Sequence, residues 1–137
     1  RKRWEDMIEI PASHADLVSD DVKSFAFLAT VMANGTPQVT PVWFNFHDGY
    51  LLINTAEGRT KDRNMRERPA IAVSIPDPKN MYRYLQIRGR VVEITGEGAV
   101  EHINWLSQKY LGKPYNLPEG QRRVIYRVEP NWVTING

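Results

Sequence analysis

The stretch FAFLATVMANGTPQVTPVWFNF, residues 25–46, decides the fold class of this chain. Two apolar runs of β-favouring residues flank Asn34 and Gly35, and both of these residues tolerate the positive φ of a tight hairpin turn. A further turn sequence, HDG, then leads to YLLINT at 50–55. The pattern predicts an antiparallel meander of three strands over residues 25–55.

Two prolines interrupt the second half of this stretch. Pro37 and Pro41 cannot donate a backbone hydrogen bond to a neighbouring strand, so we expect a sheet edge or a bulge there. Backbone groups left unpaired in this way can bind the polar edge of a planar heterocycle, with Trp43 offering an apolar face. Packing of a barrel wall explains the same apolar residues without any ligand.

Further strands are expected towards the C-terminus. They cover residues 70–78 and 82–94, and Gly89 permits a bulge or a bend in the second of them. Residues 122–135 predict two short strands around a Glu-Pro-Asn turn. With the first meander, the sequence predicts six or seven antiparallel strands and therefore a mainly β fold, a small β-barrel with flanking short helices.

Three short helices are expected beside these strands. The first falls within residues 13–25, where apolar residues recur at helical spacing. The second runs from Arg59 to Arg68 and is stopped by Pro69. The third covers residues 97–112 and ends at a glycine, which favours a helix C-terminus.

Composition is that of an ordinary globular protein. The chain has 137 residues, of which 42% are hydrophobic and 25% charged, and we expect one domain over residues 1–137. The formal net charge is only +2, so a basic site must be local. The absence of cysteine excludes disulfides and thiolate chemistry. The sequence shows no membrane-length apolar run and no signal-like start, so we expect a cytoplasmic protein.

The stretch NTAEGRTKDRNMRERP, residues 54–69, concentrates positive charge after a strand. A solvated amphipathic helix explains the charge run taken alone. Arg59, Thr60 and Lys61, however, fall in the first helical turn, where free backbone N–H groups and the helix dipole favour an anion. With Gly58 allowing close backbone approach, a phosphate site is the alternative to a solvated helix, although the GxxxxGK[ST] spacing of nucleotide P-loops is absent.

Other residues with chemical potential give weaker signals. MYRYLQIRG, residues 81–89, interleaves aromatic residues with arginines and could stack single-stranded nucleic-acid bases, but a strand with solvated arginines explains it equally. His14, His47 and His102 suggest no shared metal site. Because no acid–base or nucleophilic constellation is visible, no catalytic residue is assigned, and a cofactor would carry any chemistry.

In order, these motifs resemble the pyridoxamine-5'-phosphate-oxidase-like, FMN-binding split-barrel superfamily. The likeness is greatest to its branch of small reductases that depend on the deazaflavin coenzyme F-420. It covers about residues 15–135 and is carried by TPQVTPVWF, LLINT, GRTKDRNMRERPAIAVSI and YRYLQIRG. The resemblance implies a split β-barrel that forms a homodimer, with two cofactor sites at the subunit interface.

The resemblance also implies which residues bind the cofactor. Its phosphate would be held by the block after the third strand, which maps onto Thr55, Arg59, Thr60, Lys61 and Asn64. Its tricyclic ring would lie along the second strand, which maps onto Gln38, Val39, Thr40, Pro41, Val42 and Trp43. Asn54 would join this wall, and the partner subunit would add residues for which the candidates are Arg83, Gln86 and the region around Trp132.

The implied activity is hydride transfer between reduced coenzyme F-420 and a small conjugated organic substrate. Members that oxidise pyridoxamine phosphate end in a basic segment that has no counterpart after Gly137, and their Arg-Lys pair is Thr60-Lys61 here, with an arginine shifted to Arg59. Both departures favour the deazaflavin. The alternatives are an FMN-binding oxidoreductase or flavin-binding protein, a cofactor carrier, or a barrel that binds single-stranded nucleic acid; the low net charge argues against the last.

Overall fold

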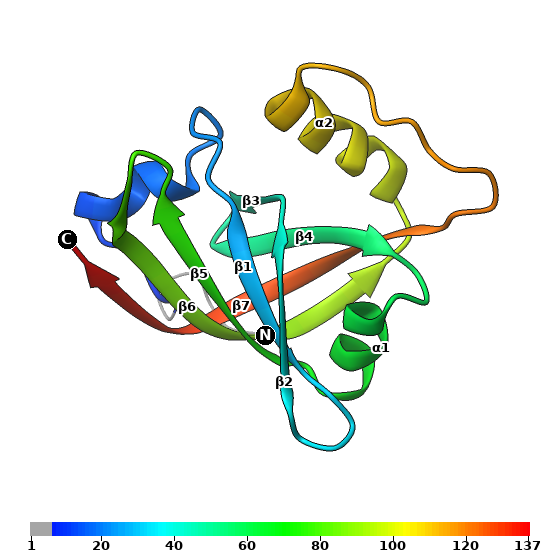
Figure 1. Ribbon diagram of the computed structural model, residues 1–137, viewed down its shortest axis with the longest axis horizontal. Coiled ribbons are helices and arrows are strands. Elements are labelled where there is room, and N and C mark those ends of the chain that lie inside the picture. Colours follow the sequence, from blue (N-terminus) through cyan, green and yellow to red (C-terminus); the bar gives the residue numbers. More distant parts are fainter. Residues whose placement is uncertain (1–6) are drawn as a thin grey trace.

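The computed structural model describes residues 7–137, whose strands form one antiparallel sheet in the order β2-β1-β5-β6-β7-β4-β3 (Figure 1). The strands are β1 (Ala26–Val31), β2 (Pro37–Val42), β3 (Phe44–His47), β4 (Tyr50–Ala56), β5 (Ala70–Asp77), β6 (Asn80–Thr95) and β7 (Arg123–Asn136). The expected absence of a signal sequence depends partly on residues 1–6, which lie outside the described residues.

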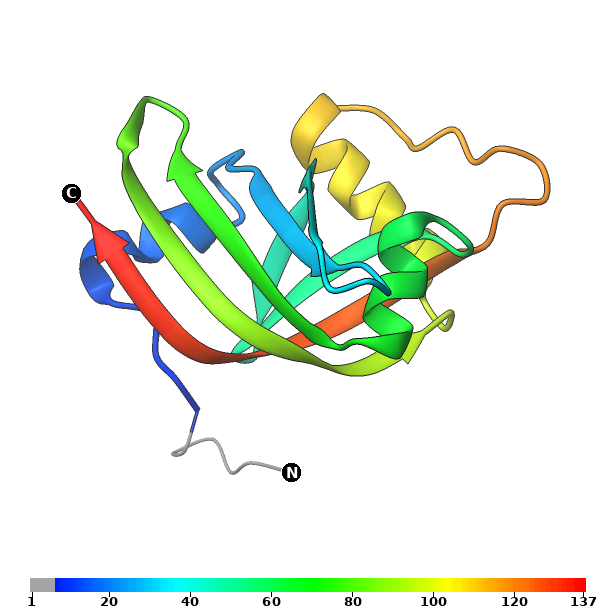
Figure 2. The same ribbon diagram turned by 60° about the horizontal axis from the view of Figure 1, so that its bottom comes forward.

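The two edges of this sheet are joined through a single residue. β2 and β3 lie at opposite ends of the strand order, yet only Trp43 separates them in the chain. In a flat sheet, six strand spacings would put these edges about 29 Å apart. The sheet therefore has to curl until its edges meet at Trp43, and Figure 2 shows this curled form. The predicted mainly β split barrel with antiparallel strands is confirmed.

The strand pairing bears on two expectations, the meander over residues 25–55 and the edge position of the two prolines. The expected continuous meander over residues 25–55 is wrong, because β2 pairs with β1 while β3 pairs with β4. TPVWFNF reads as one strand, but the chain changes sheet edge at Trp43. The expectation for the prolines is confirmed, because Pro37 and Pro41 both lie on the edge strand β2.

The long strands β6 and β7 bend around the barrel through bulges. One register shift falls between Arg88 and Gly89, as the sequence predicted. A Cβ at Gly89 would collide with the backbone carbonyl of Glu129, so only glycine allows this close approach. The two short strands expected over 122–135 are instead one strand, because β7 passes Pro130 with its pairing to β6 merely shifted.

The helices cover the ends of the barrel. The expected second and third helices are confirmed as α1 (Thr60–Glu67) and α2 (Ala99–Leu111). The first is shorter than expected and is a 3-10 helix, η2 (Ala12–Val18), which packs on β5 and β6. α1 contacts β1, and α2 contacts β4 and β7. Within residues 7–137 no helix has the length and apolar character to cross a bilayer.

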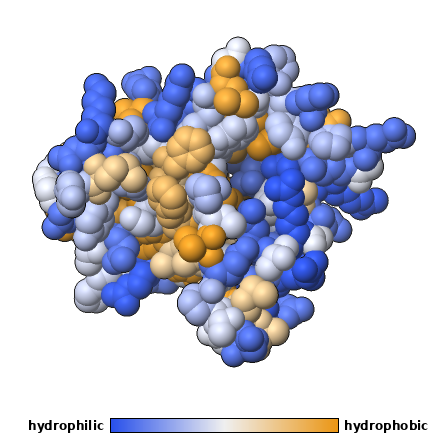
Figure 3. Space-filling view, viewed as in Figure 1, coloured by the Kyte–Doolittle hydropathy of each residue, from blue (hydrophilic) through white to orange (hydrophobic). Residues whose placement is uncertain are grey.

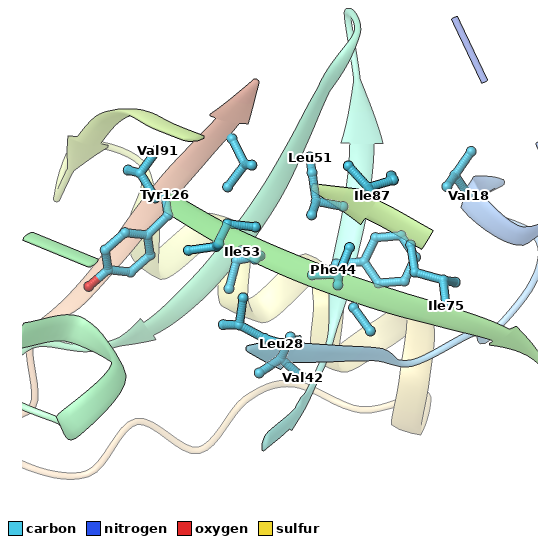
Figure 4. Close-up of a cluster of buried hydrophobic side chains, with 14 of the residues drawn as sticks. Val18, Leu28, Val42, Phe44, Leu51, Ile53, Ile75, Ile87, Val91 and Tyr126 are labelled. Atoms are coloured by element: carbon cyan, nitrogen blue, oxygen red, sulfur yellow. The ribbon is translucent and has the colours of Figure 1, made fainter. Parts of the chain in front are cut away.

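Apolar side chains fill the barrel interior (Figure 4). Alternate residues of nearly every strand point inward, including the fully buried Leu28, Phe44, Ile53 and Ile87. Each such side chain contributes about 1.5–3 kcal/mol by burial. Because the interior is packed, a ligand of more than a few atoms has to bind on the outside of this barrel.

Candidate functional site

A pocket of about 210 Å³ lies outside the barrel, where β2 passes into β3. It is bounded by the strand junction, the end of β4, the start of α1 and the side of α2. In Figure 3 hydrophilic side chains surround the recess between α1 and α2, to the right of the apolar centre of the view. The lining residues are Phe25, Pro41, Val42, Trp43, Asn54, Thr55, Arg59, Lys61, Ile103, Tyr115 and Arg123.

This pocket brings together many of the residues that the sequence predicted to bind a cofactor. From the expected ring-binding strand it includes Pro41, Val42 and Trp43, and from the end of β4 it includes Asn54 and Thr55. The expected phosphate block contributes its two first-turn cations, Arg59 and Lys61. Strand pairing explains the convergence, because closing the barrel at Trp43 brings the edge strand beside the end of β4.

Gln38 and Asn64 lie elsewhere, in a chain of polar contacts that ties α1 to the β1–β2 hairpin. The Asn64 amide donates to Thr30 Oγ1 at 3.0 Å, and Thr30 Oγ1 donates to Gln38 Oε1 at 3.0 Å. Arg68 donates to Asn64 Oδ1 and to the carbonyl of Val31. The solvated helix that explains the charge run taken alone therefore does not describe Arg68, because its guanidinium is held between α1 and β1.

Three further predicted residues lie near the pocket without lining it. Thr60 begins α1 between the two cations. Val39 faces outward from β2 and is 62% exposed. Thr40 faces inward, and its Oγ1 is buried without a hydrogen-bond partner among the described residues.

Arg83 lies at another part of the barrel, by the turn between β5 and β6. Its guanidinium donates to Asp16 at 2.6 Å, to Asp77 at 3.1 Å and to the carbonyl of Ser13 at 2.7 Å. In Figure 1 this turn and η2 lie on the left, whereas α1 and α2 lie on the right. Within one chain Arg83 therefore clamps η2 to the sheet and does not reach the pocket.

Positive charge is concentrated at the start of α1. The helix has no side-chain cap at its N-terminus, so first-turn backbone N–H groups remain available. Within the described chain neither Arg59 nor Lys61 has a carboxylate or hydrogen-bond partner for its side chain. Burial, followed by the charges of Arg59 and Arg123, lowers the pKa of Lys61. An anion is the group that this arrangement favours.

The loop before α1, which contains Gly58, is held by the buried carboxylate of Asp62. Asp62 is only 2% exposed, and its carboxylate accepts hydrogen bonds from the backbone N–H of Gly58 at 2.8 Å and from Arg66 at 2.9 Å. The hydroxyl of Tyr126 on β7 donates to the same carboxylate. Burial opposes ionisation, but these three donors outweigh it and lower the pKa of Asp62. Asp62 therefore holds the loop that leads into Arg59 and Lys61.

An aromatic cluster forms the apolar wall of the pocket. The rings of Trp43 and Tyr110 stack with centroids 5.3 Å apart and planes 6° apart, and Phe25 meets Tyr110 edge-on at 5.2 Å. The Tyr110 hydroxyl donates to the carbonyl of Ser24, which fixes α2 against the start of β1. A flat apolar wall opposite cations that have no partner in the described part of the chain suits a planar ring that carries an anionic group.

Sequence reasoning missed four lining residues, Phe25, Ile103, Tyr115 and Arg123. Only Arg123 carried a recognisable signal, as one of two arginines at the start of a predicted strand. It belongs to the site because β7 pairs with β4, which places Ala56 opposite Arg123. Nothing in the local sequence around residue 123 encodes that long-range pairing.

Comparison with known proteins identifies the family. The sequence pattern of the pyridoxamine 5'-phosphate oxidase family matches residues 20–137. Among solved structures, an F420 reductase is 33% identical, with a TM-score of 0.81, over 91% of this chain and 98% of that chain. No match was found among curated proteins.

Two more distant structures share the fold alone. A conserved hypothetical protein from Mycobacterium tuberculosis is 23% identical, with a TM-score of 0.72, over 99% of this chain and 89% of its own. HupZ from group A Streptococcus is 21% identical, with a TM-score of 0.68, over 93% and 94%. The resemblance drawn from the motifs is confirmed: this chain belongs to the pyridoxamine 5'-phosphate oxidase-like split-barrel family, in the branch of the F420 reductase.

Proposed function

We propose that this protein is an oxidoreductase that binds coenzyme F-420 in the pocket beside Trp43 and reduces a small conjugated organic substrate. The observation that carries the proposal is the uncapped N-terminus of α1, which faces the pocket with two cations that have no carboxylate partner within residues 7–137. A phosphate is the group on this cofactor that such a site favours. The 33% identity to an F420 reductase supports the deazaflavin as the cofactor.

The residues present fit this cofactor. Thr55 lines the pocket, and its buried Oγ1 has no hydrogen-bond partner among the described residues, so a polar ligand atom at this wall would satisfy it. Arg59 and Lys61 would hold the phosphate, and Pro41, Val42 and Trp43 would contact the ring. When bound, a deazaflavin supplies two-electron hydride transfer. The protein's own contribution would be to fix the ring against this wall and leave one face open for the substrate.

A second copy of the chain would complete the site. Small-molecule pockets typically enclose about 300–1,000 Å³, whereas this one encloses about 210 Å³ and is open to solvent. Residues directly opposite one another on paired strands share one face of the sheet. Strand register therefore places one outward row across five strands, from β2 to β7: Val39, Ala29, Ala72, Arg88 and Trp132.

This outward face is suited to contact with a partner subunit. A neighbouring row on the same face begins with Pro41, which also lines the pocket, and includes Phe27 and Gln86. Apolar residues gather over β1 and β2 in Figure 3. A homodimer formed through this face would place residues of its partner, such as Gln86 and Trp132, beside the open side of the pocket.

FMN is the second candidate cofactor. The matching family is described as pyridoxamine 5'-phosphate oxidase, and FMN shares with coenzyme F-420 a three-ring system and a phosphate. The cations Arg59 and Lys61 and the aromatic wall therefore suit both molecules. In that case the protein would be an FMN-binding oxidoreductase or flavin-binding protein.

Titration of the purified protein with each cofactor, followed by fluorescence, tests the proposal. We expect coenzyme F-420 to bind more tightly than FMN, and Lys61→Ala to weaken its binding by about 1.5–3 kcal/mol, the range for a charge-assisted hydrogen bond. Lys79→Ala, which removes an exposed lysine in the β5–β6 turn, is the matched control. Failure of both cofactors to bind below about micromolar concentration would overturn the proposal, and tighter binding of FMN would replace it with the alternative.

A further inference from the structure

Arg123 is a buried cation held only by neutral acceptors. It is 7% exposed at the start of β7. Its Nε donates to Asn54 Oδ1 at 2.9 Å, and its Nη1 donates to Gln121 Oε1 at 3.1 Å and to the Tyr115 hydroxyl at 3.3 Å. Within residues 7–137 no carboxylate pairs with it and Nη2 has no partner. Buried arginines are normally paired with an acid, so this charge is left uncompensated at the pocket wall.

The amide of Asn54 is held in the orientation that Arg123 requires. Its Nδ2 donates to the carbonyl of Ala99 at 2.8 Å and lies 3.1 Å from Nδ1 of His102. Both amide hydrogens are thereby used on the α2 side. Only Oδ1 remains for Arg123, and it accepts from Nε. A reversed amide would set its NH₂ group against the guanidinium, where neither group can accept a hydrogen bond.

The contacts of His102 require the tautomer that carries its hydrogen on Nε2. Its Nε2 lies 2.7 Å from Oδ1 of Asn45, an acceptor, so Nε2 carries the hydrogen and Nδ1 accepts from Asn54. Burial, followed by the charge of Arg123, lowers the pKa of His102 to about 4, so the ring is neutral near pH 7. The contacts therefore run from β3 through α2 and β4 to Arg123 on β7.

We propose that Arg123 is a further anion-binding residue of the pocket, and that Asn54 and His102 are positioning residues that aim its guanidinium without neutralising it. The inference depends on the proposed function only for the identity of the anion, which would be the cofactor phosphate. Arg123 approaches the pocket from β7, whereas Arg59 and Lys61 approach from α1. An anion would then be held from two sides of the recess.

The electrostatics of the pocket agree with this geometry. The charges of Arg59 and Arg123 both disfavour the charged form of Lys61, after burial, and Arg59 also disfavours that of Arg123. The three cations thus repel one another, and an anion between them would relieve that repulsion. A neutral amide at position 54 preserves this positive field, which a carboxylate there would cancel.

Charge removal at Arg123 is the first test. We expect Arg123→Gln to weaken coenzyme F-420 binding by about tenfold or more, and Arg122→Gln to leave it within about twofold. Arg122 is a suitable control because it is exposed, adjacent and of the same charge. Inorganic pyrophosphate is titrated in parallel by calorimetry as a probe of the anion site.

The outcomes separate this inference from the proposed function. If neither cofactor binds but pyrophosphate binds and is lost in Arg123→Gln, the cofactor proposal fails and the inference stands. If the cofactor binds and both arginine variants behave alike, the inference is overturned and the function stands. If neither cofactor nor pyrophosphate binds the unaltered protein, both are overturned.

A matched pair of variants tests the positioning role of His102. In His102→Asn the amide oxygen can replace Nδ1 and still accept from Asn54, whereas in His102→Gln the amide reaches only the place of Nε2, beside Asn45. We expect His102→Asn to bind the anion at least about threefold more tightly than His102→Gln. Packing alone predicts the reverse, because glutamine is closer to histidine in size.

Two further measurements complete this test. In an Arg123→Gln background the difference between the His102 variants should disappear, because its effect passes through Arg123. ¹⁵N NMR of the unaltered protein should show the Nε2–H tautomer of His102, and this measurement needs no variant to fold. An Nδ1–H tautomer, or binding by His102→Gln equal to or tighter than that by His102→Asn, would overturn the positioning role.

Discussion

The hydroxyl of Tyr126 on β7 donates a hydrogen bond to the buried carboxylate of Asp62 on α1. This bond ties the barrel wall to the helix whose first turn lines the candidate site. Figure 4 shows the ring of Tyr126 within the apolar cluster and its hydroxyl pointing out of it. Asp62 in turn accepts from the N–H of Gly58, in the loop before Arg59 and Lys61. One carboxylate thus links the core to the candidate anion site.

Tyr126→Phe tests this link. Loss of a hydrogen bond to a charged, buried group should lower the free energy of unfolding by about 1.5–3 kcal/mol. The Asp62 pKa, now below its ordinary value of 3.8, should rise in the variant because one donor to the carboxylate is gone. Urea unfolding and NMR titration of the Asp62 carboxylate measure the two effects.

Tyr82→Phe provides the control for that variant, because Tyr82 is 83% exposed. Removal of the Tyr82 hydroxyl should change neither the free energy of unfolding nor the pKa of Asp62. The stability that Asp62 contributes is present above pH 3.8 and is lost as the pH falls through its lowered folded-state pKa. Unchanged unfolding in Tyr126→Phe would show that Gly58 and Arg66 suffice to hold the carboxylate.

The lowered pKa of Lys61 predicts that affinity for an anion in the pocket will depend on pH. A bound anion favours the charged amine, so the pKa of Lys61 is higher in the complex than in the free protein. Affinity should therefore be constant while free Lys61 is protonated. Affinity should fall as the pH rises through the pKa of Lys61 in the free protein. That pKa lies below the ordinary value of 10.5, so the fall should begin at a lower pH than for an ordinary lysine. Fluorescence titrations from about pH 7 to about pH 10 measure this.

Lys61→Arg is the matched variant for that experiment, because arginine keeps its charge throughout this range. The fall in affinity should disappear in it. A fall of equal size in both proteins would assign the pH dependence to another group.

Substitution on the outward sheet face tests the proposed dimer. Val39→Lys should produce monomers, because it sets a charge beside the apolar residues Ala29 and Phe27 in the face that a partner subunit would cover, and a two-fold interface would bury that charge on both subunits. Val92→Lys is the control, since Val92 is also exposed but lies at the bulge of β6. Sedimentation analysis gives the oligomeric state. Dimers that persist in Val39→Lys would move the interface to another face.

Features encoded by neighbouring residues were predictable from the sequence. Gly35 adopts a φ of 86°, and Asn34 Oδ1 accepts from the backbone N–H of Thr36 at 3.1 Å, which together form the expected hairpin turn. α1 ends before Pro69 as expected, because proline cannot continue a helix. Such signals are local, and they determine both the hairpin and the helix whose start carries the cations.

Features that depend on closure of the barrel could not be predicted in the same way. No local signal separates β2 from β3 at Trp43, since the prolines mark an edge strand but not the point where the chain leaves it. Asn54 is 48 residues from His102 and 69 from Arg123, and their contacts exist only because α2 and β7 both pack on β4. The cations of α1 were therefore predictable, whereas Ile103, Tyr115 and Arg123, which complete the pocket, were not.

Trp43 combines both roles, because it joins the sheet edges and forms the aromatic wall of the pocket. Trp43→Leu keeps an apolar side chain there but removes a flat ring, so coenzyme F-420 and FMN should both lose about 0.5–1.5 kcal/mol of binding free energy, the usual contribution of an aromatic pair beyond its area. Trp105→Leu, which changes a half-exposed tryptophan on α2, should leave both affinities unchanged. Titrations of both variants with each cofactor measure these changes. A loss of affinity in Trp43→Leu alone would indicate that the cofactor ring lies against the strand junction. Equal losses of affinity in the two variants would indicate that the ring lies away from Trp43.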